Sequence, residues 1–403
     1  MSGDRKPPET RGRRGARHGL VRGLAFTAVF FLILLEIAAR GFWSYWLDVP
    51  FFRAGELRTA MHFAYYPNLK PVYEAEIRDG DGTFDVLLLG GSVINEWYGD
   101  IELRLAADLR SRVDGPVRIH NVSFPGHMTR DSYAKYALLG HQRFDLVVVY
   151  HGINDVVANN VSRADYRADY SHLLWIDGYQ RLTRHPSITL PILAAPYTTR
   201  FGIAKIKERL PIAGAIRRND PEFRQRHRLG ADLKTPPSFR DNLDSIAALA
   251  SRRGDPLVLM TFAWYVPEDY TLEKSEAKAL DYAEHRSAIE IWGEPANVKR
   301  TLEAHNDMVV EVAEKHHTLF VDQRASIPDG RIYHNDVAHL APSGCQAWVN
   351  NLMDVLDPWL ATVGVGPSPR LEGRGSQGGL IAVFTYSAAA RWVANHTPGF
   401  DRM

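Results

Sequence analysis

The chain has 403 residues, which suits one large domain with appendages or two small domains. Hydrophobic residues make up 45% and charged residues 24%, proportions typical of a folded globular protein, so wholesale disorder is excluded. Lys and Arg (48) nearly balance Asp and Glu (47), so no overall field points to nucleic acid as a partner. The single cysteine, Cys345, excludes an intramolecular disulfide and a zinc site built from cysteines.

The N-terminus has the pattern of a membrane anchor. Residues 1–22 form a basic tail with seven Lys or Arg against the single acid Glu9 between positions 5 and 22. Residues 23–46 are apolar and end in an aromatic cluster, a stretch long enough to cross a bilayer as a helix. The basic side should stay in the cytoplasm, which would place the rest of the chain in the periplasm or outside the cell. No plausible cleavage site follows, so an uncleaved signal-anchor is expected, with a buried amphipathic helix as the alternative.

One acid interrupts this apolar stretch. A carboxylate at Glu36 would cost a few kcal/mol within a bilayer. Arg40 follows four residues later, so the two side chains should lie on the same helix face. We therefore expect Glu36 to pair with Arg40 or to reach the membrane interface.

The remainder alternates strand and helix patterns. Residues 47–82, with three prolines and no clear period, are interpreted as a juxtamembrane connector. Short apolar runs typical of strands buried on both faces then occur at residues 85–89, 117–122, 145–150, 257–262 and 318–322. Helical patterns lie between and after them, at residues 101–113, 131–139, 239–252, 295–316 and 342–360. This alternation predicts a three-layer α/β/α sandwich with a parallel sheet over residues 83–362.

Two segments depart from the alternation. Residues 156–237 are long and rich in Arg, Tyr and Pro, and such an insertion forms either a lid over the substrate or a decorative subdomain. Residues 363–403 begin with Gly, Ser, Pro and Arg, which predicts a flexible C-terminal tail.

The first strand pattern runs directly into Gly-Gly-Ser, with the serine at position 92. In a parallel sheet, ligands bind beyond the carboxyl ends of the strands, where Ser92 should lie. Position 94 is Ile, so the Gly-x-Ser-x-Gly elbow of α/β-hydrolases does not fit. Taken alone, the turn could equally bind phosphate.

The next two strands end in candidate hydrogen-bond donors. Gly126 follows the second strand pattern and offers a backbone N–H, and Asn154 follows the third and offers a side-chain amide. Both would project into the same crevice as Ser92, where fixed donors could stabilise an oxyanion. Each could also be an ordinary turn residue.

A histidine and a carboxylate lie near the end of the predicted domain. Asp336 and His339 are three residues apart, so in a helical turn both side chains would lie on one side. The carboxylate could then orient the imidazole while its other nitrogen takes a serine proton. His334 is close enough in sequence for the three residues to form a metal site, an alternative that we set aside in favour of no metal.

Together, these blocks resemble the SGNH (GDSL-like) hydrolases, over roughly residues 83–360. The resemblance implies a flavodoxin-like fold, with Ser92 as nucleophile, His339 as base and Asp336 as its orienting partner. It further implies that the oxyanion donors are the Ser92 amide, the Gly126 amide and the Asn154 side chain, and that Asp155 is structural. The family usually has Asp before the serine, where this chain has Gly91. Gly-Gly-Ser resembles a variant found in the membrane-anchored branch of the family, to which the resemblance therefore assigns the chain.

The expected function is hydrolysis of an acetyl or other short-chain ester through an acyl-serine intermediate, at the outer face of a membrane. An alternative is an O-acyltransferase or deacetylase that acts on an envelope glycan, because the same triad serves these reactions. A protein of another class, a non-catalytic glycan-binding or assembly protein on the same fold, is the third possibility. No cofactor and no nucleic-acid partner are expected, and the sequence does not identify a protein partner.

Overall fold

In a computed structural model of the chain, the described residues are 11–47, 49–52, 57–78, 80–183 and 227–364. They belong to two compact units. The first contains the chain up to Tyr65 and returns at Gly178, and the second begins at Tyr66 and contains most of the remaining residues. Part of the long insertion (184–226) and nearly all of the C-terminal tail (365–403) lie outside the described residues.

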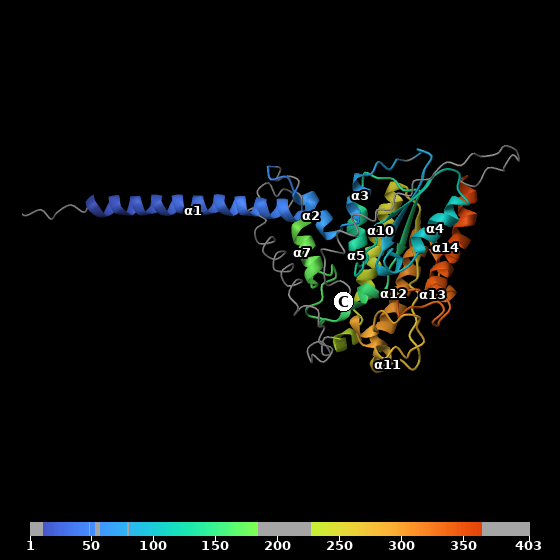
Figure 1. Cartoon of the computed structure of the whole chain (residues 1–403). Helices are drawn as coiled ribbons and strands as arrows, with labels where there is room; N and C mark the ends of the chain where they lie inside the picture. Colours follow the sequence, from blue (N-terminus) through green and yellow to red (C-terminus); the bar gives the residue numbers. More distant parts are fainter. Residues whose placement is uncertain (1–10, 48, 53–56, 79, 184–226, 365–403) are drawn as a thin grey trace, which may run out of the picture. The chain divides into compact units, whose positions relative to one another are not determined.

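The first unit is dominated by the long helix α1 (Arg11–Leu47), shown in blue in Figure 1. Its segment Leu20–Tyr45 has a mean hydropathy of 2.2 and is long and apolar enough to cross a membrane. Of the residues in this segment, only Ala39 and Trp43, near its end, are buried. A signal sequence has the same length and composition. Arg40 Nε donates to Glu36 Oε1 at 2.6 Å, which confirms the pairing expected from their spacing.

A short helix packs beside the end of α1. Helix α2 (Leu57–Tyr65) contributes Met61 to a small apolar cluster with Trp43 and Val49. In the second unit, α3 (Leu69–Glu74) precedes the first strand. The sequence pattern did not indicate either helix, because both are short and are separated by Pro67.

The second unit is built on a five-stranded parallel sheet with the order β2-β1-β3-β4-β5. Its strands are β1 (Phe84–Gly90), β2 (Val117–Asn121), β3 (Leu146–Tyr150), β4 (Leu257–Met260) and β5 (Leu319–Val321). Each coincides with a predicted strand run. The three central strands β1, β3 and β4 are buried on both faces, as their apolar runs predicted. The edge strands β2 and β5 are not, because each has a neighbouring strand on one side only. This strand order is that of flavodoxin-like folds, so the predicted fold class is confirmed.

Two helix layers cover the sheet (Figure 1). On one face, α4 (Ile101–Arg110) packs against α14 (Pro342–Val363). On the other, α10 (Thr235–Arg253) lies between α5 (Thr129–Leu138) and α12 (Pro295–His316). The short helices α6 (Ile153–Val156), α7 (Leu174–Thr183), α11 (Leu272–Glu276) and α13 (Gln323–Ser326) lie in the connections.

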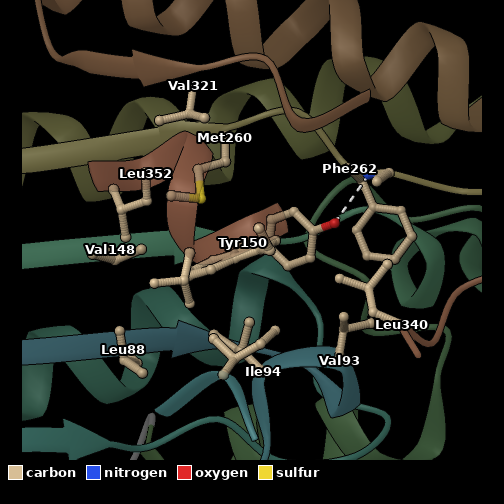
Figure 2. Close-up of a cluster of buried hydrophobic side chains, with 14 of the residues drawn as sticks. Leu88, Val93, Ile94, Val148, Tyr150, Met260, Phe262, Val321, Leu340 and Leu352 are labelled. Atoms are coloured by element: carbon tan, nitrogen blue, oxygen red, sulfur yellow. Dashed lines mark hydrogen bonds between the residues drawn. The ribbon is translucent and has the colours of Figure 1, made fainter. Parts of the chain in front are cut away.

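The core beside the sheet extends to the ends of the strands, as Figure 2 shows. Tyr150, the last residue of β3, is fully buried, and its hydroxyl accepts a hydrogen bond of 3.0 Å from the N–H of Ala263. Its ring stacks on Phe262, which follows β4. These contacts fix the loops after β3 and β4 at the edge where the candidate site residues lie.

Candidate active site

The site lies at the carboxyl edge of the sheet, where three neighbouring strands end. Gly90, the last residue of β1, is paired with Tyr150 at the end of β3. On the other side of β1, hydrogen bonding to the β2 chain continues past the end of β2, because the N–H of Phe124 donates to Gly90 O at 3.3 Å. The turns after β1, β2 and β3 therefore start side by side.

Ser92 begins a single 3₁₀ turn (Ser92–Ile94) directly after β1. Gly90 makes this turn possible, because a Cβ there would lie 2.6 Å from Ile94 Cδ1 and 2.8 Å from Tyr150 O. The chain can leave the strand this tightly only without a side chain at that position.

The structure brings Ser92, His339 and Asp336 into one chain of hydrogen bonds. Ser92 Oγ lies 2.8 Å from His339 Nε2, and His339 Nδ1 lies 2.8 Å from Asp336 Oδ2. Asp336 has no exposure and His339 has 3%, so the pair is shielded from water. In this arrangement Nδ1 carries the proton donated to Asp336, which leaves Nε2 able to take the proton of Ser92.

The loop that carries the pair is not the helical turn that the sequence predicted. Asp336 folds back on its own backbone, and its Oδ1 accepts hydrogen bonds from the N–H groups of Ala338 (2.9 Å) and His339 (2.8 Å). An antiparallel bridge between His334 and Leu340 closes the loop. A short Asp side chain readily makes such a local turn, which competes with helix formation.

These contacts also set the charge of the carboxylate. Burial by itself would raise the pKa of Asp336, but the adjacent His339 ring and the two N–H donors outweigh it. The pKa of Asp336 therefore lies below its ordinary value, and the group is ionised at neutral pH.

An aromatic ring covers His339. The Tyr98 ring stacks on the imidazole with the ring centres 4.5 Å apart and an angle of 15° between the planes. Arg286 donates to the Tyr98 carbonyl at 2.9 Å and lies over its ring. Tyr98 thus fixes the plane of the imidazole, a contact that no motif in the sequence indicated.

Gly126 lies in a tight turn after β2. The N–H of His127 donates to Phe124 O at 3.1 Å, and Gly126 has φ +79°. Proline at position 125 and a positive φ at position 126 are the features of a type II turn. The closing hydrogen bond comes from His127, so the turn does not use the Gly126 N–H.

The Asn154 side chain is held at both ends. Its Nδ2 donates to His127 O at 2.9 Å, and its Oδ1 accepts from Trp292 Nε1 at 3.4 Å. One N–H of the amide is left for another acceptor. A Cβ at Gly91 would lie 2.6 Å from Asn154 Nδ2, so the amide lies against the residue before Ser92.

Asp155 points away from these groups. Its carboxylate accepts hydrogen bonds from the backbone N–H of Thr129 (3.1 Å) and the Thr129 hydroxyl (2.6 Å), and it is fully buried. Burial raises the pKa of Asp155 to about 7, although the bonds from Thr129 act in the opposite direction. Its contacts join α5 to the turn after β3, as a structural role requires.

Among the residues that the structure describes, no group of three or more His, Cys, Asp or Glu side chains is arranged to hold a metal ion. His334, which its sequence position makes a possible ligand with Asp336 and His339, is fully buried within the same loop. Asp336 uses both oxygens within the loop, on His339 and on two backbone N–H groups.

No family model and no curated protein sequence matches this chain. Several solved structures do. A GDSL-like lipase from Bacteroides thetaiotaomicron has a TM-score of 0.41 at 13% identity, over 74% of this chain and all of that one. The acetylxylan esterase Axe2 from Geobacillus stearothermophilus has a TM-score of 0.37 at 13% identity, over 70% of this chain and 96% of that one. A lipase/acylhydrolase from Enterococcus faecalis has a TM-score of 0.35 at 13% identity, over 68% of this chain and 96% of that one.

The four sequence blocks meet at the carboxyl edge of the sheet, with the Gly126 block joined to the others through the carbonyl of His127, which accepts from Asn154. Ser92 is hydrogen-bonded to His339, and Asn154 lies against the turn that carries Ser92. In the order of its blocks, in its flavodoxin-like sheet and in its Ser–His–Asp hydrogen bonds, the chain is similar to the SGNH (GDSL-like) hydrolases.

Proposed function

We propose that this protein is a serine esterase that hydrolyses a short-chain acyl ester through an acyl-serine intermediate. The observation that carries the proposal is the unbroken chain of hydrogen bonds from Ser92 through His339 to Asp336. A serine hydroxyl is a weak nucleophile unless a base takes its proton, and here the base is already in contact with it.

The reaction follows from this arrangement. His339 Nε2 takes the proton of Ser92 Oγ as the oxygen attacks the ester carbonyl, and Asp336 stabilises the resulting imidazolium. The negative oxygen of the tetrahedral intermediate would accept hydrogen bonds from the N–H groups of Ser92 and Gly126 and from Asn154 Nδ2. Collapse breaks the bond to the alcohol, which leaves with the proton from His339. Water then repeats the two steps, releases the carboxylic acid and restores the serine.

The burial of the site supports a small acyl group. Ser92 is 6% exposed and Asn154 is 8% exposed, and Tyr98 lies over the His339 ring. An acetyl group needs little room beside Ser92, whereas a long acyl chain would need a channel lined by apolar side chains.

The N-terminal segment supports a location outside the cytoplasm. The basic residues precede the apolar segment Leu20–Tyr45, and a spanning helix with this charge distribution keeps its basic end inside. The site would then act on esters at the outer face of the membrane.

The test is release of p-nitrophenol from p-nitrophenyl acetate by the full chain in detergent. Ser92→Ala should lower the rate by several orders of magnitude, because the triad acts as a unit. Ser238→Ala is the matched control, since Ser238 is a similarly buried serine on α10 whose hydroxyl contacts Tyr166. Activity that survives Ser92→Ala would overturn the proposal.

The same assay separates hydrolysis from transfer. With an acceptor sugar present, a hydrolase releases acetate, whereas an O-acyltransferase yields an acetylated sugar whose mass is higher by one acetyl group. If neither acetate nor acetylated sugar formed with any short ester, the non-catalytic glycan-binding alternative would replace the proposal.

A further inference from the structure

A lysine is buried beside the oxyanion side of the site. Lys135, on α5, is 1% exposed, although lysine is among the residues least often buried. Removal of an ammonium group from water is costly unless the group is paired and hydrogen-bonded. The position of this side chain therefore needs a physical reason.

The ammonium joins the two ends of the loop after β2. Lys135 Nζ donates to Val122 O at 2.6 Å and to His127 Nδ1 at 3.0 Å. Val122 directly follows β2, and His127 closes the type II turn, so Gly126 lies between the two acceptors. A single side chain thus holds the loop that presents the Gly126 N–H.

The histidine in this contact is a neutral acceptor. An ammonium group can only donate, so Nδ1 of His127 must be unprotonated. Burial lowers the pKa of His127 well below its ordinary value, and the positive charge of Lys135 adds to this effect. The imidazole therefore stays neutral and can accept from Lys135 across the neutral pH range.

The same loop fixes the second donor. The carbonyl of His127 accepts from Asn154 Nδ2 at 2.9 Å. A shift of His127 would therefore move the Asn154 amide as well as the Gly126 N–H. Lys135 contacts neither donor, yet both depend on the residue that it holds.

A carboxylate one helical turn away offsets part of the cost of burial. Asp131 accepts from the N–H of Met128 at 2.9 Å and from the Tyr66 hydroxyl at 3.1 Å. Burial lowers the pKa of Lys135 to about 7, against the attraction of Asp131. A lysine near neutrality still has N–H groups to donate, so the two loop contacts survive loss of its proton.

We propose that Lys135 is a positioning residue of the oxyanion hole: through Val122 O and His127 it sets the positions of the Gly126 N–H and the Asn154 amide. The inference rests on the proposed function, because an oxyanion hole matters only if Ser92 attacks a carbonyl. A lysine that merely filled the core would affect stability alone.

The test compares an ester with its thiono analogue. Sulfur is a weak hydrogen-bond acceptor, so p-nitrophenyl thionoacetate gains little from oxyanion donors, whereas p-nitrophenyl acetate gains their full effect. Lys135→Met keeps the length of the stem and removes the donors. We expect kcat for the acetate ester to fall by about 10- to 100-fold with KM little changed. This loss is smaller than the loss in kcat on removal of a whole oxyanion donor, because the donors are displaced and not removed. The preference for the oxygen ester should fall by a similar factor.

Three further variants make the test decisive. Tyr136→Phe removes a buried hydroxyl group from the same helix. That hydroxyl donates to Asp255, away from the loop, so this variant should leave the preference for the oxygen ester unchanged. In an Asn154→Ala background, Lys135→Met should cost less than it does alone, because part of its effect is already lost. His127→Phe keeps the ring contacts with Tyr66 and Phe124 but removes the acceptor, and it carries the test if Lys135→Met does not fold.

The proposal is overturned if folded Lys135→Met or His127→Phe retains the wild-type preference, or if the rates with both esters fall equally. Neither result would bear on the proposed function, which stands or falls with Ser92→Ala.

Discussion

The two halves of the candidate site are held in different ways. On the triad side, Asp336 and His339 lie three residues apart and are locked by hydrogen bonds within their own loop. On the proposed oxyanion side, Gly126 and Asn154 come from separate turns, and a buried lysine on a helix contacts both ends of the loop that carries Gly126.

This difference shows which parts of a site a short motif can encode. The Asp336–His339 pair lies within one loop and needs only its own residues at the right spacing. The proposed oxyanion donors lie in turns after two different strands, and their positions depend on side chains distant in sequence, here Lys135 and Trp292. Substitutions on the two sides should therefore differ in both size and character.

The largest effect is expected on the triad side. His339→Ala removes the base and Asp336→Asn favours the wrong tautomer, and each should lower kcat for p-nitrophenyl acetate by roughly 10⁴-fold. The thiono ester should slow by a similar factor, because the base acts on the nucleophile whatever the carbonyl atom. Steady-state kinetics with both esters checks this, and a selective loss with the oxygen ester would break the distinction between the two halves.

A smaller effect is expected at Gly91, where the chain departs from the Gly-Asp-Ser pattern. A Cβ there would lie 2.6 Å from Asn154 Nδ2 and 3.4 Å from His127 O. Gly91→Ala should therefore displace the Asn154 amide, a proposed oxyanion donor, and lower kcat by about 10- to 100-fold. The upper end of this range approaches the loss in kcat expected on removal of one such donor.

The control for this prediction removes the other partner of the clash. In an Asn154→Ala background, the added methyl group no longer meets the amide, so Gly91→Ala should have little further effect on kcat. An undiminished loss in that background would show that residue 91 acts through something other than Asn154.

Much of the molecule was predictable from local patterns. The three central strands β1, β3 and β4 are buried on both faces, so their apolar runs stood out. Helix α12 begins and ends at the predicted residues. Ser92 and His339 could be singled out from the sequence because each lies within a short recognisable block, Gly-Gly-Ser after a strand and Asp-x-x-His. The spacing placed Asp336 beside His339 correctly, but the helical turn expected there was wrong, because the aspartate bonds to its own loop backbone.

The contacts that support the site were not predictable. Lys135 occupies an ordinary helical pattern, and nothing near it in sequence shows that its head group meets Val122 O. Trp292 and Tyr98 likewise reach Asn154 and His339 only through the fold. Long-range polar contacts of this kind carry no local periodicity, so a single sequence does not disclose them.

The smallest effect is expected in stability rather than in rate. Because burial raises the pKa of Asp155 to about 7, the folded chain holds this proton at pH values where the unfolded chain has lost it. The contribution of this group to stability is then fully present below about pH 4 and is lost as pH rises toward 7. Asp155→Asn should remove this dependence, which is on the order of a few kcal/mol across that window.

Denaturant unfolding of the full chain in detergent between pH 4 and 8 measures the effect. The free energy of unfolding of the wild type relative to Asp155→Asn should fall between pH 4 and 7 and level off above. Asp241→Asn, at an exposed carboxylate on α10, should leave the pH profile unchanged. A flat difference between wild type and Asp155→Asn would show that Asp155 is ionised throughout and that its burial is compensated.

Covalent labelling tests whether Ser92 is the nucleophile and whether His339 activates it. The full chain is treated with a fluorophosphonate ester, and the modified peptide is identified by mass spectrometry. We expect one adduct, on Ser92, that forms far more slowly in His339→Ala and is absent in Ser92→Ala. An adduct on another residue, or a Ser92 adduct that forms at the same rate without His339, would contradict that expectation.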